Sequence, residues 1–135
     1  MVRLIEAQGG DASFIDAPER LATAGQTVDV LAVKEGTVVE VAPRLLGEGV
    51  IALGGGRTHM AQKPDLSVGF QMHVRPGDDV SVGDRLATVH ARDQEGSRLG
   101  ESLVHRAVVI GDSGQVPELR PLVSHRVDEH GVVKF

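Results

Sequence analysis

Two Gly-Asp pairs, six residues apart, constrain the fold of this chain more than any other feature. They occupy positions 77–78 and 83–84 within the segment Val74–Leu86, and apolar residues lie between and around them. A glycine adopts a positive φ without steric cost, and an aspartate can accept a hydrogen bond from the backbone of its own turn. Each pair therefore predicts a tight β-corner. Corners of this kind are typical of small sandwiched barrels, so we expect a β-rich core.

The composition is that of one small globular domain. The chain has 135 residues, which suits a single domain with a core of its own. No cysteine is present, which excludes disulfides and thiolate chemistry. The 17 glycines indicate frequent turns.

Charge and aromatic content argue against several partners. The net charge is −5, Tyr and Trp are absent, and only three Phe residues occur. These features argue against nucleic acid and anionic membranes as partners, and they leave no aromatic platform for stacking bases. No apolar run approaches the length of a bilayer, and the acidic Glu6 comes too early for a signal peptide. We expect a soluble, cytoplasmic protein.

Hydrophobic periodicity predicts secondary structure of mixed type. Helices are expected over residues 17–24, 45–53 and 97–110. Strands are expected in residues 27–42 with a turn at Gly36, in residues 69–91, around 121–126 and at 131–135. These elements follow one another without a βαβ rhythm, so the predicted fold class is α+β.

Capping residues and apolar stripes support these helices. Asp16, Pro18 and Glu19 favour a helix start, and Asp93 or Ser97 can cap the third helix. The apolar stripe of the third helix is expected in the core and includes Leu99, Leu103, Val104, Ala107 and Val108.

The first residues are open to two readings. Leu4 and Ile5 are apolar, but no start signal precedes them, and the segment Gln8–Asp11 breaks any helix. The segment is either a frayed terminus or the last turn of a helix from a preceding domain. We predict a lead-in with a short helix over residues 1–25 and the main domain over residues 26–135.

The corners, together with the strand Gly36–Val41, resemble biotinyl and lipoyl carrier domains. A carrier needs a lysine on a hairpin tip shortly after its second Gly-Asp turn, and Val89–Gln94 contains none. About thirty residues, 43–73, also intervene where a carrier continues directly. The sandwich architecture is therefore expected without the carrier function.

Five motifs occur in order along most of the chain. They are Glu6–Asp11, Leu46–Arg57, Asp65–Phe70, the two Gly-Asp corners and Leu86–Asp93. This ordered set resembles the C-terminal portion of thymidine and pyrimidine-nucleoside phosphorylases, from about residue 2 to about residue 112. The resemblance implies a barrel-sandwich hybrid with an inserted α/β-hammerhead.

The same resemblance implies a function that depends on residues outside this portion. Members of the family are homodimers that cleave pyrimidine nucleosides with phosphate, giving free base and a (deoxy)ribose 1-phosphate. Their catalytic and phosphate-binding residues lie upstream of the portion matched by this chain, so no catalytic residue is placed on it. We expect an accessory domain, inactive alone and without cofactor, whose partner is the remainder of the phosphorylase. Phosphate and nucleoside are expected only in the full enzyme, and the chain is expected to begin partway through such an enzyme.

Two other functions remain open from the residues themselves. A free-standing sandwich module, related to carriers but lacking the modified lysine, is the alternative, and its discriminating feature is the placement of Lys34, Lys63 and Lys134. An enzyme acting alone needs a catalytic set that the sequence does not contain.

The candidate site is the run Gly54, Gly55, Gly56 and Arg57, with His59 beyond it. Glycine amides and a guanidinium suit an anion, but the glycines follow a helix, where its dipole has the wrong sign. One reading is a plain helix stop with an exposed arginine. The other, which the family resemblance implies, is a loop bordering the nucleoside cleft when the domains close.

The remaining polar residues suggest structure rather than chemistry. His73 and His90 lie on expected strands and are able to face each other, but no spacing matches a zinc motif, so no metal is expected. Asp78, Asp79 and Asp84 are interpreted as turn formers.

Overall fold

Three antiparallel sheets organise the chain in this computed structural model, which describes residues 1–117 and 123–134. The first sheet has the order β1-β5-β3, with β1 at Gln26–Leu31, β5 at Arg85–Ala91 and β3 at Gly69–Met72. The second has the order β4-β2-β6, with β4 at Asp79–Val80, β2 at Gly36–Val41 and β6 at Val108–Ile110. The third is the hairpin of β7 (His125–Asp128) and β8 (Gly131–Lys134). The α+β prediction is confirmed, and within the described ranges the sheets do not close into a barrel.

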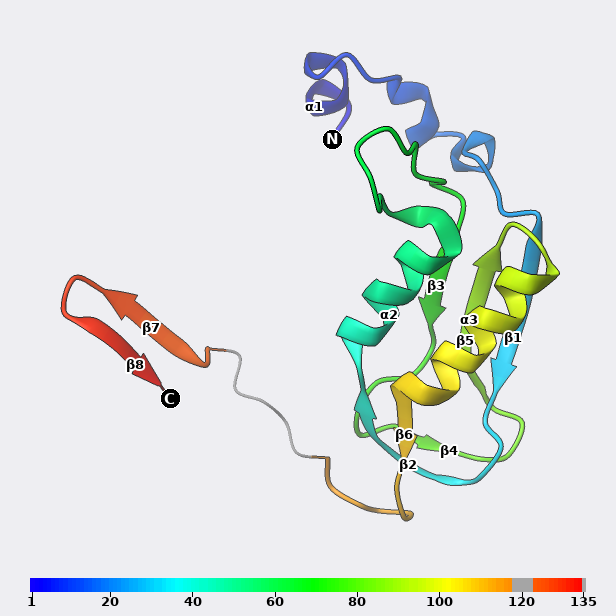
Figure 1. Ribbon diagram of the computed structural model, residues 1–135, viewed down its shortest axis with the longest axis vertical. Helices are drawn as coiled ribbons and strands as arrows, with labels where there is room; N and C mark the ends of the chain where they lie inside the picture. The colour runs from blue at the N-terminus through cyan, green and yellow to red at the C-terminus, as the bar shows by residue number, and fades with distance from the viewer. Residues whose placement is uncertain (118–122, 135) are drawn as a thin grey trace.

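Two helices cover one face of the first sheet (Figure 1). Helix α2 (Pro43–Val50) follows β2, and α3 (Gln94–Ala107) connects β5 to β6. Beyond α2 the chain continues in a wide π-type turn, Ile51–Gly55. The predicted helix at 45–53 is thus confirmed, with its start two residues earlier.

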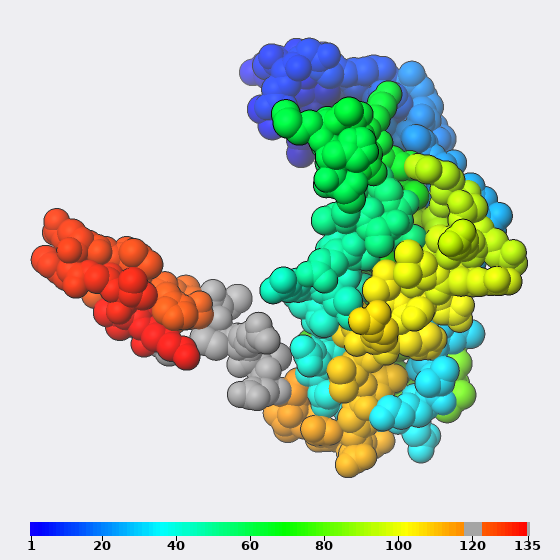
Figure 2. Space-filling view, in the orientation of Figure 1, coloured from blue at the N-terminus to red at the C-terminus, as the bar shows by residue number. Residues whose placement is uncertain are grey.

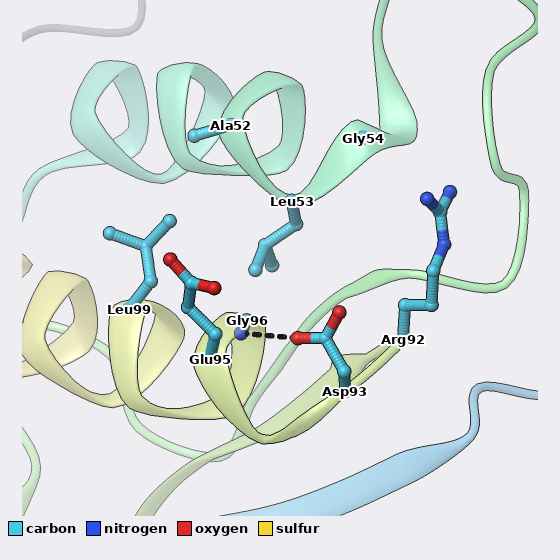
Figure 3. A pocket seen from close by; sticks show the side chains of 8 residues that line it. All are labelled: Ala52, Leu53, Gly54, Arg92, Asp93, Glu95, Gly96 and Leu99. Carbon is cyan, nitrogen blue, oxygen red and sulfur yellow. Dashed lines mark hydrogen bonds between the residues drawn. The ribbon is translucent and has the colours of Figure 1, made fainter.

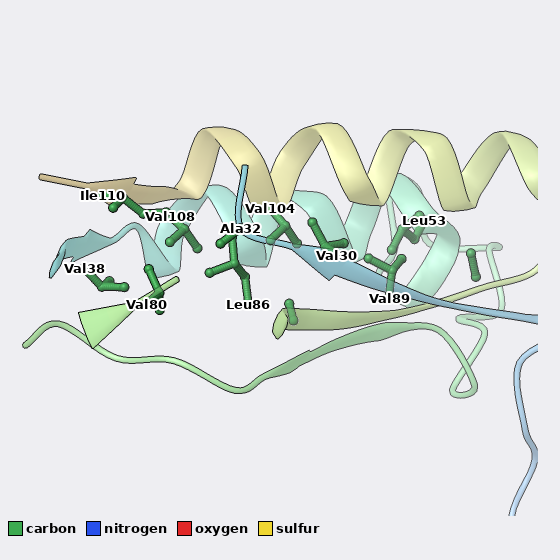
Figure 4. Close-up of a cluster of buried hydrophobic side chains, with 12 residues drawn as sticks. Val30, Ala32, Val38, Leu53, Val80, Leu86, Val89, Val104, Val108 and Ile110 are labelled. Carbon is green, nitrogen blue, oxygen red and sulfur yellow. The ribbon is translucent and has the colours of Figure 1, made fainter. Parts of the chain in front are cut away.

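The core lies between α3 and the strands (Figure 4). Its largest fully buried side chains are Val30, Val38, Leu86, Val89 and Val104. Burying an aliphatic side chain of this size contributes roughly 1.5–3 kcal/mol, so these residues dominate the stability of the fold. Leu103 and Ala107 of the predicted stripe are buried, but Leu99 is 41% exposed and lies outside the core.

Both Gly-Asp corners form as predicted. Their glycines have φ values of +100° and +91°. Asp78 accepts a hydrogen bond from the backbone N–H of Arg75 at 2.9 Å, and Asp84 accepts one from Ser81 at 2.7 Å. These two aspartates are therefore turn formers.

Asp79 is different, and the prediction that it forms a turn is wrong. It lies on β4, and its carboxylate accepts a 2.6 Å hydrogen bond from the hydroxyl of Thr37 on β2. Its role is to join two neighbouring strands.

The predicted helix over residues 17–24 is wrong. Only a single 3-10 turn, Pro18–Arg20, forms there, and its N-cap residue Ala17 makes no side-chain hydrogen bond. Leu21 is 54% exposed, so the segment has no packed apolar face to hold a short helix together. Upstream, Val2–Ala7 forms helix α1, none of whose residues is buried, and Ala12–Ile15 forms a second 3-10 turn.

The predicted helix over residues 97–110 has the wrong bounds. It begins at Gln94, because Asp93 caps it by accepting a 2.8 Å hydrogen bond from the N–H of Gly96. It ends at Ala107, because the β-branched residues that follow pair with β2 as strand β6.

The C-terminal hairpin agrees with prediction where it is described. The strand expected around 121–126 falls partly outside the described residues, and β7 begins at His125. The strand expected at 131–135 is β8, and all of residues 123–134 are exposed. The hairpin stands apart from the two larger sheets (Figure 2).

Among the described residues, none of the helices has the length and apolar character needed to cross a lipid bilayer.

Candidate functional site

Backbone conformation and packing favour the three glycines of the candidate site. Gly54 has a φ of +97°, a conformation that side chains other than glycine rarely adopt. A Cβ atom at Gly55 would lie 2.7 Å from Cγ1 of Val50, and one at Gly56 would lie 2.6 Å from Cγ1 of Ile51. The glycines let the chain fold back against the last turn of α2, which supports the helix-stop reading of this run.

The segment that these glycines open is a structured loop, called the 54–65 loop below. Thr58 donates from its N–H and its hydroxyl to Oε1 of Gln62, at 2.9 and 2.7 Å. The N–H of Gln62 donates to the carbonyl of His59 at 3.1 Å. These bonds shape the tip of the loop around one glutamine side chain.

The side chains of the loop tip face solvent. Arg57, His59 and Lys63 are exposed, and Met60 is 96% exposed. Within residues 1–117 and 123–134, neither Arg57 nor His59 makes an ion pair. The tip therefore presents a mildly positive surface.

The base of the loop is closed by Asp65. Its N–H donates to the carbonyl of Gly54 at 2.9 Å. Its Oδ1 accepts from the N–H and hydroxyl of Ser67, at 3.0 and 2.6 Å, and its Oδ2 accepts from Nε and Nη2 of Arg92, at 3.2 and 3.0 Å. The hydrogen bonds from Ser67, followed by those from Arg92, lower the pKa of Asp65 to about 2. Both oxygens of this carboxylate therefore have hydrogen-bond partners within the protein.

A pocket of about 260 Å³ lies beside this base, between the wide turn after α2 and the start of α3 (Figure 3). It is lined by Ala52, Leu53, Gly54, Arg92, Asp93, Glu95, Gly96 and Leu99. The start of α3 would suit an anion, but the carboxylate of Asp93 already accepts from the N–H of Gly96, and Glu95 adds a second negative charge. Phosphate is therefore disfavoured in this pocket.

The two histidines expected on strands do not face each other. His90 lies on β5, but His73 follows the last residue of β3, so the prediction that it lies on a strand is wrong. The backbone of His73 bonds to Leu86, whereas His90 pairs with Gly69, four positions further along β5. His73 Nε2 lies 2.8 Å from the hydroxyl of Thr88.

Thr88 connects that histidine to a carboxylate on β1. Its hydroxyl donates to Asp29 at 2.6 Å, so the imidazole of His73 is the donor in its own contact with Thr88. The bond from Thr88, with the charge of Arg85 nearby, lowers the pKa of Asp29. Among the described residues, no group of three His, Asp or Glu side chains is arranged to hold a metal.

The lysines do not occupy a carrier position. After the second corner, β5 leads directly into α3 rather than into a hairpin. Lys34 lies between β1 and β2, Lys63 lies in the 54–65 loop, and Lys134 lies on β8. The tip that a carrier would modify is replaced by a helix start.

The sequence predicted the residues at the tip of the loop, Arg57 and His59, as a candidate site, but it did not predict the contact between Asp65 and Arg92 at the base. The spacing Asp65-x-Ser67 is a local turn signal that was available in the sequence. Arg92 lies 27 residues away, and nothing local predicts that contact.

Comparisons with known proteins agree with the family resemblance that the motifs indicated. The family described as Pyrimidine nucleoside phosphorylase C-terminal domain matches residues 37–111. A thymidine phosphorylase of Burkholderia cenocepacia is 41% identical over 127 residues, which are 93% of this chain and 28% of that protein. A thymidine phosphorylase of Burkholderia lata is 41% identical over 116 residues, 85% of this chain and 26% of the relative. The chain thus spans little more than a quarter of the length of these curated relatives.

Proposed function

Because the chain belongs to the family of pyrimidine nucleoside phosphorylase C-terminal domains, we propose that it is the accessory domain of a thymidine or pyrimidine-nucleoside phosphorylase. The observation that carries this proposal is the share of each protein that the match covers. About 40% identity extends over 93% of the chain, yet the match accounts for only 28% of a thymidine phosphorylase. The whole enzyme would split a pyrimidine nucleoside with phosphate into free base and a (deoxy)ribose 1-phosphate.

The chemistry of the described residues supports a division of labour within the proposed enzyme. The carboxylates of the pocket, Asp93 and Glu95, disfavour phosphate there. The proposed partner is the remainder of the phosphorylase, which would supply the catalytic residues, bind phosphate and nucleoside, and form the homodimer.

The finer description of the fold belongs to this proposal. A barrel-sandwich hybrid with an inserted α/β-hammerhead is supported by the two antiparallel sheets, the Gly-Asp corners and the segment 43–73 that separates β2 from β4. The domain division at residue 25 is supported by the start of β1 at Gln26, after a lead-in without buried residues.

The 54–65 loop is the proposed contact with the nucleoside cleft. Arg57 and His59 are exposed at its tip, and Gly54, Gly55 and Gly56 set the path of the backbone that presents them. When the domains of the full enzyme close, these residues would border the bound nucleoside and phosphate.

A chimera tests the proposed function directly. The chain would replace the 127 matching residues of the Burkholderia cenocepacia relative, and thymine release from thymidine with phosphate would be measured. The chimera is expected to be active, whereas the relative without those residues and the 135-residue chain alone are expected to be inactive. A chimera that folds and dimerises without phosphorolysis would contradict the proposal, as would activity of the purified chain alone.

A further inference from the structure

We infer that Arg92 and Asp65 form a latch that fixes the base of the 54–65 loop to the start of helix α3. The two ends of the loop are already joined by the hydrogen bond from the N–H of Asp65 to the carbonyl of Gly54, at 2.9 Å. The guanidinium of Arg92 then binds the carboxylate of Asp65 from the side of α3, at 3.0 and 3.2 Å. Figure 3 shows the Arg92 side chain rising from the start of α3 toward Gly54.

The carboxylate is well suited to serve as the anchor point. One oxygen accepts two hydrogen bonds from Ser67 and the other accepts two from Arg92. With both oxygens occupied, Asp65 has a single orientation, and its side chain is only 23% exposed. Two N–H groups of one planar guanidinium bind the same oxygen, which fixes the direction of approach of Arg92.

The arginine is held in place at its backbone. The residue that follows it, Asp93, caps α3. A Cβ atom at Gly25 would lie 2.7 Å from the carbonyl oxygen of Arg92, so the chain before β1 packs closely on this residue. Arg92 therefore has a fixed position from which its side chain reaches the loop.

The guanidinium of Arg92 lies beside Gly54. Nη2 of Arg92 lies 3.5 Å from the position that a Cβ atom at Gly54 would occupy. This is an ordinary van der Waals distance, so Gly54 is required by its positive φ and not by the space that Arg92 occupies. With both ends of the loop held by these contacts, Arg92 is a positioning residue for Arg57 and His59.

The role in catalysis rests on the proposed function, but the latch itself is testable in the chain alone. Amide hydrogen exchange would be measured in the wild type, in Arg92→Met, in Arg92→Lys and in Asp65→Asn. Arg85→Met is the matched control, because Arg85 also pairs with an aspartate across the surface, through a single 3.4 Å contact with Asp29.

The latch predicts a local effect. In Arg92→Met and Asp65→Asn, the amides of residues 55–65 are expected to exchange about fivefold faster relative to those of β5. Arg92→Lys should fall between these variants and the wild type, because an ammonium does not reproduce the two-point contact. Arg85→Met should leave the ratio unchanged.

Three results would overturn the latch. The first is unchanged amide exchange of the loop in Arg92→Met. The second is an equal acceleration of amide exchange in the loop and in β5. The third is the same acceleration of loop exchange in Arg85→Met. Failure of the proposed function would look different. In that case Arg92→Met would release the loop in the chain alone, yet the chimera carrying the unchanged chain would fold and dimerise without phosphorolysis.

Discussion

Gly100 of α3 lies directly against Val89 of β5, and both residues are buried. A Cβ atom at Gly100 would overlap Cγ1 of Val89. This contact allows α3 to approach the first sheet closely and brings Val104, one turn further along, into the core. The spacing between helix and sheet therefore depends on the absence of a single side chain.

Gly100→Ala is expected to destabilise the chain by about 1–3 kcal/mol, because the added methyl group forces helix and strand apart. Urea unfolding followed by circular dichroism measures this change. Gly47→Ala on α2 is the matched control, since no atom lies within 4 Å of its Cβ position. The control should gain about 0.5–1 kcal/mol from helix propensity alone. Equal effects of the two substitutions would show that the contact with Val89 is unimportant.

Thr37→Val is expected to cost about 1–3 kcal/mol although the two side chains have the same shape. The Thr37 hydroxyl is buried, donates to Asp79 at 2.6 Å and accepts from the N–H of Gly114 at 2.8 Å. Valine leaves both partners without their bond. The same substitution at the exposed Thr27 should change the free energy of unfolding by less than about 0.5 kcal/mol. A similar small change at Thr37 would contradict the prediction.

Asp65 is expected to titrate near pH 2 in the folded chain. Since this folded pKa lies below the ordinary value of 3.8, the stability that the carboxylate contributes is present above pH 3.8 and is lost as the pH falls toward about 2. Carboxyl-carbon NMR measures the titration. Ser67→Ala and Arg92→Met should each raise the pKa, and Arg85→Met should not. A pKa that stays the same in both of the first two variants would refute the assigned causes.

Arg57→Ala is expected to change the stability of the isolated chain by less than about 0.5 kcal/mol, as exposed substitutions usually do. In the active chimera the same change is expected to weaken turnover or the use of phosphate. Thermal unfolding and steady-state kinetics separate the two effects. A large loss of stability would show that Arg57 has a structural role. Unchanged kinetics would show that Arg57 does not contribute to the nucleoside cleft.

We expect no biotinylation or lipoylation of the chain, because α3 follows β5 at the position where a carrier has its modified hairpin. Coexpression with a biotin or lipoate ligase, followed by intact mass spectrometry, tests this. A mass shift located on Lys34, Lys63 or Lys134 would favour a free-standing carrier module instead.

The sequence by itself determined the features that depend on neighbouring residues. Glycine followed by aspartate specifies a corner locally, since one residue supplies the positive φ and the other bonds the turn, and both corners form. Alternation of apolar residues determined β1, β2 and β5 in the same way. The order of these local motifs was also sufficient to indicate the family.

Only the tertiary structure decided the features that depend on distant partners. Residues 108–110 continue a helical pattern in the sequence but become β6, because the edge of β2 offers them backbone hydrogen bonds. Residues 17–24 carry good helix signals but no surface to pack against, so they remain a turn. Asp65 and Arg92 meet across 27 residues because β3 and β5 are neighbours in one sheet. Packing and ion pairing at such separations depend on where the whole chain lies, and no local pattern contains that information.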